Sequence, residues 1–251
     1  MRALLKLSLA SSLAVALCAC SGADPNQFPA GPKDAAPPPL TNGDAGSFNN
    51  DAGTFGNTPP AVTCDPQSVG GYSPKWTPPE AWKQKACSAT QISGFYTACL
   101  TPPISAQTCG TFVQANGSCA SCLQSQDTDA KAAAIVWHEN EAYWTVNVAG
   151  CIANAMGDPS ASGCGAAYSA AIACRQQSCN ACWAAQGTSA TFQQFATCEQ
   201  QAGSSTCSSF ASAVPTACGD LTTSAAGVCM PQSGATAQAA YMQVAPLFCG
   251  Q

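Results

Sequence analysis

The stretch CGAAYSAAIACRQQSCNACW, residues 164–183, sets four cysteines among alanine, serine and glutamine. The first two cysteines stand ten residues apart, and the last two form a Cys-x-x-Cys pair. Spacings near ten residues suit short helices whose ends are cross-linked to neighbouring elements. Because alanine-rich helices bury little apolar area per residue, disulfides are needed to supply part of their stability. This stretch therefore predicts a bundle of short helices held together by disulfides.

Similar cysteine spacings recur along the chain and indicate partial internal repeats. In the set from Cys87 to Cys122 and in the set from Cys151 to Cys182, the first two intervals are nearly equal and the last two cysteines form a Cys-x-x-Cys pair. In particular, SCASCL (118–123) matches SCNACW (178–183). The cysteines from Cys198 to Cys249 resemble a third copy that lacks a Cys-x-x-Cys pair.

One segment departs from this helical pattern. AAAIVWHENEAYWTVNV (132–148) carries β-branched and aromatic residues on both sides of the polar tetrapeptide HENE, which is typical of a β-hairpin. We place its strands near 132–137 and 142–148. The predicted fold class is thus mainly α: a disulfide-rich bundle of short helices with one β-hairpin.

The start of the chain carries the motifs of an exported protein. Basic residues precede a short apolar run at 7–17, and the run ends in LCAC (17–20). This ending resembles the signal of bacterial lipoproteins, in which a leucine and a small residue precede the cysteine that receives the lipid. The resemblance implies cleavage after Ala19, lipidation of Cys20 and a membrane anchor, and Ser21 favours the outer membrane or cell surface. The alternative is an ordinary signal peptide cut at the same position.

The cysteine count agrees with export. Of the 18 cysteines, Cys18 would leave with the signal and Cys20 would carry the lipid, so sixteen remain between Cys64 and Cys249. An even number can close into eight disulfides without a free thiol. Disulfides also persist in exported proteins, because the compartment outside the cytosol is oxidising.

These motifs divide the chain into three parts. Residues 1–19 are the predicted lipoprotein signal peptide. Residues 20–63 hold the lipidated cysteine and a tether rich in Pro, Gly, Asp and Asn. Such a tether has too few large apolar residues to fold, and it reaches roughly 35 Å. Residues 64–251 form the predicted cysteine-rich helical domain with the partial repeats.

Few side chains of this domain suit catalysis. The only histidine of the chain, His138, opens the sequence HENE. A zinc-protease motif needs a second histidine four residues later, where Ala142 stands. His138, Glu139 and Glu141 could ligate a metal, but at a hairpin tip we expect solvated polar side chains instead. We therefore predict no catalytic residue, no metal and no cofactor.

The charge of the domain excludes one class of partner. Between residues 64 and 251 there are nine acidic and five basic residues. The domain therefore lacks the positive surface that binds the phosphates of nucleic acid, and we predict no nucleic-acid partner.

The Cys-x-x-Cys pairs raise one enzymatic alternative. Cys119 with Cys122, or Cys179 with Cys182, could serve a thiol–disulfide oxidoreductase, whose reactive pair begins a helix that follows a strand. Neither pair follows a clear strand in this sequence. We therefore favour structural half-cystines for all four residues.

The tether with its DAG units, the hairpin and the two Cys-x-x-Cys pairs together resemble the cysteine-rich lipoproteins of myxobacteria, a family without an established activity. The resemblance implies a location and a scaffold. We expect a non-catalytic binding or structural protein at the envelope or cell surface, anchored to the membrane by its lipid. The hairpin aromatics are expected in the core, with an aromatic binding platform as the alternative. The candidate contact for a partner protein or glycan is the hairpin tip, which consists of His138, Glu139, Asn140 and Glu141.

Overall fold

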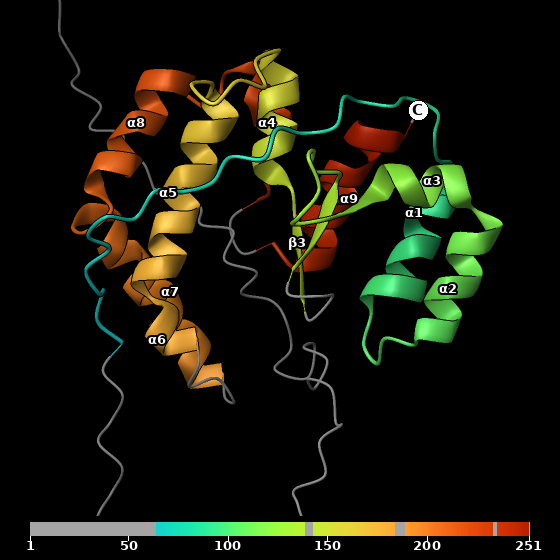
Figure 1. Cartoon of the computed structure of the whole chain (residues 1–251), viewed down its shortest axis with the longest axis horizontal. Helices are drawn as coiled ribbons and strands as arrows, with labels where there is room; N and C mark the ends of the chain where they lie inside the picture. Colours follow the sequence, from blue (N-terminus) through green and yellow to red (C-terminus); the bar gives the residue numbers. More distant parts are fainter. Residues whose placement is uncertain (1–63, 139–142, 184–188, 233–234, 251) are drawn as a thin grey trace, which may run out of the picture.

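The protein is described by a computed structural model over residues 64–138, 143–183, 189–232 and 235–250 (Figure 1). These residues confirm the predicted class, a mainly α, disulfide-rich fold with a small sheet. The strands are β1 (Gln124–Gln126), β2 (Ile135–His138) and β3 (Tyr143–Val146). The helices are α1 (Ala89–Phe95), α2 (Ala106–Ala115), α3 (Gly117–Leu123), α4 (Val148–Met156), α5 (Cys164–Ser178), α6 (Asn180–Trp183), α7 (Ser189–Ser204), α8 (Ser208–Cys218) and α9 (Ala237–Cys249), with a π-helical turn η1 (Tyr96–Leu100) and a 3₁₀ turn η2 (Ala225–Cys229).

One half of the molecule is built around Tyr241 of α9. This side chain has no solvent exposure, and its ring centroid lies 6.4 Å from that of Phe95 and 5.4 Å from that of Tyr96. Its hydroxyl donates a hydrogen bond of 2.8 Å to the backbone oxygen of Ile92, so the buried phenol is not left unpaired. These contacts fix α9 against α1, and α2 and α3 pack beside them on the right of Figure 1.

The sheet has the strand order β1-β2-β3 and contains the predicted hairpin. β2 and β3 pair in antiparallel fashion, with Trp137 opposite Trp144. The hairpin is therefore confirmed, with strands shorter than the sequence predicts. The third strand, β1, is not predicted; it pairs in parallel with β2. Its sequence Gln-Ser-Gln has no apolar alternation, so only the neighbouring strand identifies it as extended.

The other half packs α4, α7 and α8 around α5. Gly165 of α5 allows the close approach of α4, because a Cβ at this position would lie 2.6 Å from the Cβ of Ala153. A second, smaller core here consists mainly of buried cysteines together with Phe195 and Ala202. The apolar core of this half is therefore thin, as the alanine-rich sequence predicts. None of the described helices is both long and apolar enough to cross a membrane.

An extended strap, residues 64–88, ties the two halves together. The Gln67 N–H donates to the Ser178 oxygen at 2.8 Å at one end, and the Cys87 N–H donates to the Cys249 oxygen at 2.7 Å at the other. Between them, the Trp76 indole donates to the Pro159 oxygen at 3.0 Å. Figure 1 shows this blue-green segment crossing the molecule from the α6 and α7 side to α1.

Eight disulfides join all sixteen cysteines of the described residues, as the even count predicts. The repeated spacing is not matched by repeated connectivity. Two disulfides stay within the first cysteine set, whereas every cysteine of the set from Cys151 to Cys182 bonds outside that set. The pairs are Cys64–Cys182, Cys87–Cys119, Cys99–Cys109, Cys122–Cys249, Cys151–Cys229, Cys164–Cys218, Cys174–Cys207 and Cys179–Cys198.

Candidate functional site

The solvent-facing side of the small sheet gathers the polar and aromatic side chains of the hairpin. Along β2, Ile135 and Trp137 are buried while the residues that alternate with them are half-buried, as expected when one side of a sheet covers a core. The strand pairing then places residues of β3 and of the loop after β1 on the same outer side. We call this surface the outer sheet face; it consists of Asp127, Val136, His138, Tyr143 and Thr145.

His138 lies at the centre of the outer sheet face. Its Nδ1 lies 3.4 Å from Oδ2 of Asp127, and its Nε2 lies 2.9 Å from Oγ1 of Thr145. The ring also stacks on Tyr143, with centroids 4.8 Å apart and planes 14° from parallel. The side chains of His138 and Asp127 are 24% and 38% exposed. Both side chains are therefore partly accessible to solvent.

This geometry can orient an imidazole between a carboxylate and a hydroxyl. The carboxylate favours a proton on Nδ1, and Nε2 then accepts a hydrogen bond from the Thr145 hydroxyl or, in the imidazolium, donates one to it. Such an arrangement suits hydrogen bonding to a polar ligand beside an aromatic ring. Within the described ranges, no group of three His, Cys, Asp or Glu residues is placed to hold a metal ion.

Sequence reasoning located only part of this face. Of the predicted contact residues, His138 lies on it, while Glu139, Asn140 and Glu141 lie outside the described residues. His138 is half-buried and paired rather than a freely solvated tip residue. The sequence analysis did not identify Asp127 or Thr145 as residues of this face. Thr145 could have been identified, because it lies two residues from Tyr143 on the paired strand and therefore shares its face. Asp127 lies on this face because it directly follows β1, which pairs with β2.

The four cysteines of the redox alternative lie in four different disulfides. Cys119 bonds to Cys87, and Cys122 bonds to Cys249. In the second pair, Cys179 bonds to Cys198 and Cys182 bonds to Cys64. All four cysteines are at most 3% exposed. Neither Cys-x-x-Cys pair forms its own disulfide in this arrangement, and all four cysteines are buried.

A buried charged pair lies away from the outer sheet face. Arg175 of α5 and Glu199 of α7 are 7% and 2% exposed. Burial raises the pKa of Glu199 to about 7, although the positive charge of Arg175 opposes the shift. Burial likewise lowers the pKa of Arg175, opposed by Glu199. The two side chains are enclosed between helices, so their interaction bears on helix packing rather than on a ligand.

Comparison of the chain with protein-family models, with curated proteins and with solved structures finds no match.

Proposed function

We propose that this protein is a non-catalytic binding module of the bacterial envelope or cell surface, anchored by a lipid on Cys20. Its disulfide-braced helices hold the outer sheet face in a fixed position, and that face contacts a partner protein or a glycan. Loops and surfaces carried on rigid scaffolds commonly serve this purpose. The 43 residues that precede Cys64 after the lipidated cysteine would hold the domain away from the membrane surface.

One observation carries the proposal: the cysteines of both Cys-x-x-Cys pairs are divided among four buried disulfides. A thiol–disulfide oxidoreductase needs an accessible thiolate that attacks its substrate and a nearby partner that resolves the mixed disulfide. Disulfides that connect distant segments instead restrict the unfolded chain. The arrangement therefore favours a scaffold over redox turnover.

The anchor is tested by membrane fractionation of cells that express Cys20→Ala. We expect this variant to leave the membrane fraction, because stable attachment requires the acyl chains. Cys18→Ala is the matched control, since it removes the neighbouring cysteine and leaves the acceptor, and it should remain membrane-bound. Full membrane retention of Cys20→Ala would refute the lipid anchor.

The binding role is tested with glycan arrays and with cross-linking to envelope proteins. Tyr143→Ala removes the aromatic ring of the outer sheet face, and Thr216→Ala, an alanine substitution at an exposed position of α8, is the control away from this face. We expect Tyr143→Ala alone to lose captured glycan or protein. Equal capture by both variants would contradict a role for this face. Catalytic reduction of insulin, lost on Cys119→Ser or Cys179→Ser, would replace the proposal with the oxidoreductase.

A further inference from the structure

Two segments of the chain contain no charged residue and fold next to each other. Residues 87–126 and 221–250 include no Asp, Glu, Lys, Arg or His. They form α1, η1, α2 and α3 on one side and η2 and α9 on the other, and the Cys122–Cys249 disulfide joins them. We call this part of the molecule the neutral lobe. All charged groups of the domain lie outside it.

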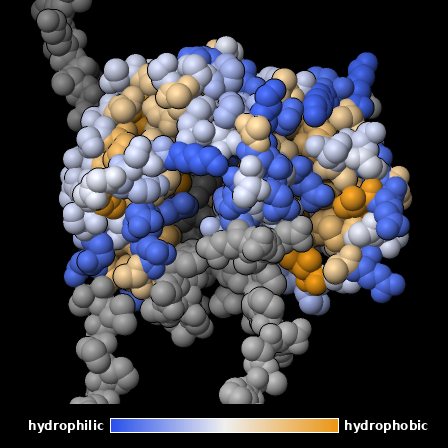
Figure 2. Space-filling view, viewed as in Figure 1, coloured by the Kyte–Doolittle hydropathy of each residue, from blue (hydrophilic) through white to orange (hydrophobic). Residues whose placement is uncertain are grey.

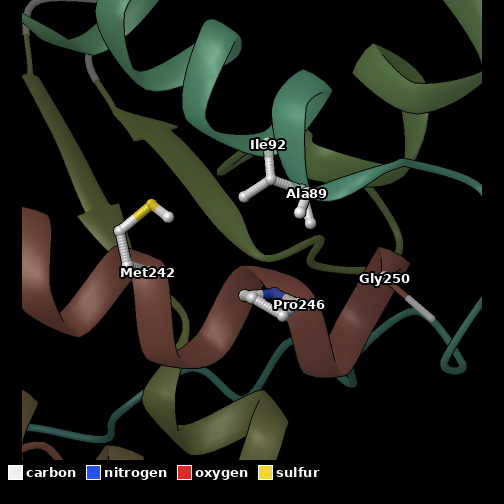
Figure 3. Close-up of a pocket in the computed structure, with 5 residues that line it drawn as sticks. All are labelled: Ala89, Ile92, Met242, Pro246 and Gly250. Atoms are coloured by element: carbon white, nitrogen blue, oxygen red, sulfur yellow. The ribbon is translucent and has the colours of Figure 1, made fainter.

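An apolar groove lies between α1 and α9 on the neutral lobe, and Figure 3 shows the residues that line it. Ile92 is buried within the groove, whereas Met242 is 39% exposed at one end of it. Val228 of η2, 52% exposed, lies beside α9, because the Gln243 side chain donates a 2.8 Å hydrogen bond to its backbone oxygen. The groove residues are Ala89, Ile92, Met242, Pro246 and Gly250.

These apolar side chains are unusual for the surface of this protein. On the face shown in Figure 2, hydrophobic residues are scattered among hydrophilic ones. The large apolar side chains that are exposed in the described part of the chain are Met156, Val228 and Met242. Val228 and Met242 belong to the neutral lobe, and Met242 lines its groove.

We propose that the neutral lobe is a self-association surface, in which Met242 of each copy packs against Ala89 and Pro246 of a second copy about a twofold axis. Interface cores are depleted of charge and enriched in methionine, whose flexible side chain adapts to an irregular groove. A twofold contact repeats each residue on both sides, so a charged surface would place like charges close together. The neutral lobe avoids this repulsion in a protein whose net charge is −5.

Two charged residues beside the groove agree with this arrangement. Lys83 and Lys85 belong to the strap, and their backbone N–H groups donate to the oxygens of Phe248 and Gly250 at the end of α9. A twofold axis near Met242, in the middle of α9, keeps the lysines of the two copies at opposite ends of the contact. The proposal does not depend on the lipid anchor or on the binding role of the outer sheet face.

The test is sedimentation equilibrium of the full chain in a non-ionic detergent whose density is matched by the solvent. We expect the wild-type mass to rise from one chain toward two with concentration, and added salt not to weaken this association, because the contact contains no ion pairs. Met242→Glu should weaken association at least tenfold by placing two carboxylates near the axis. Met156→Glu is the matched control, since it charges an equally exposed methionine on α4, and it should associate like the wild type.

Two further variants separate the contact from effects on folding. Ala89→Glu adds an acidic residue to the first turn of α1, which favours the helix, and should also weaken association without lowering the melting temperature. An equimolar mixture of Met242→Glu and Met242→Lys should regain dimers by pairing opposite charges across the axis. A wild-type monomer at millimolar concentration, dimers unaffected by Met242→Glu, or a mixture that stays monomeric would overturn the proposal.

Discussion

Arg175 and Glu199 are the only charged side chains that lie buried in the described part of the chain. Removing an ionised carboxyl from water is unfavourable, and the arginine compensates only in part, so the pKa of Glu199 rises to about 7. The Nε of Arg175 and Oε2 of Glu199 have no hydrogen-bond partner among the described residues. The fold therefore prefers the neutral form of this acid.

This preference makes the stability of the protein depend on pH. Since the pKa of Glu199 is higher in the folded than in the unfolded state, its contribution is fully present below pH 4.5 and is lost as the pH rises to about 7. We expect the wild type to lose about 3 kcal/mol over this interval relative to Glu199→Gln, whose amide does not ionise. Urea unfolding of both proteins at several pH values measures the difference. A constant difference across the interval would show that Glu199 does not titrate there.

At the scale of elements, Gly165 fixes the distance between α4 and α5. An added Cβ would lie 2.6 Å from the Ala153 Cβ, whereas at Gly110 in α2 it would meet no atom within 4 Å. Gly110→Ala should therefore stabilise by about 0.5–1 kcal/mol, the gain expected in a helix. Gly165→Ala should destabilise by about 1–3 kcal/mol because the helices must separate. Chemical denaturation of the two variants checks this, and equal effects would contradict the close packing.

The hairpin is attached to the helices by its inner side. Trp144 is half-buried and packs edge-on against Tyr96 of η1, with ring centroids 6.4 Å apart. We expect Trp144→Ala to lower the free energy of unfolding by about 3 kcal/mol. Thr145→Ala on the outer sheet face removes only a partly exposed hydrogen bond and should cost about 1 kcal/mol. Thermal unfolding of both variants measures these losses. If Thr145→Ala were the more destabilising of the two, the hairpin would pack on the helices by its outer side instead.

Elements with a strong local signal could be predicted from the sequence, and those defined by distant contacts could not. The hairpin follows from its aromatic and β-branched runs, and the disulfide-braced helices follow from the cysteine spacing. β1 is polar and extended only because β2 lies beside it. The sequence alone therefore does not predict that Asp127 lies next to His138. The disulfide pairs also remained open, because spacing alone does not determine which cysteines meet in space.

At the scale of the whole molecule, the disulfides and the strap replace a large apolar core. Cys122–Cys249 and Cys64–Cys182 span 127 and 118 residues. Closing loops of this length in the unfolded chain contributes up to about 5 kcal/mol each. One of these bonds holds α9 to α3, and the other fastens the start of the strap beside α6. Long-range cross-links of this kind keep both halves in place although the second core is thin.

The central claim is that both Cys-x-x-Cys pairs are structural, and peptide mapping of the unreduced protein at acidic pH tests it most directly. Mass spectrometry of the linked peptides should find Cys119 with Cys87 and Cys122 with Cys249. It should also find Cys179 with Cys198 and Cys182 with Cys64, and no cysteine between residues 64 and 249 should react with a thiol reagent. A Cys119–Cys122 or Cys179–Cys182 disulfide, or a free thiol in either pair, would contradict the account.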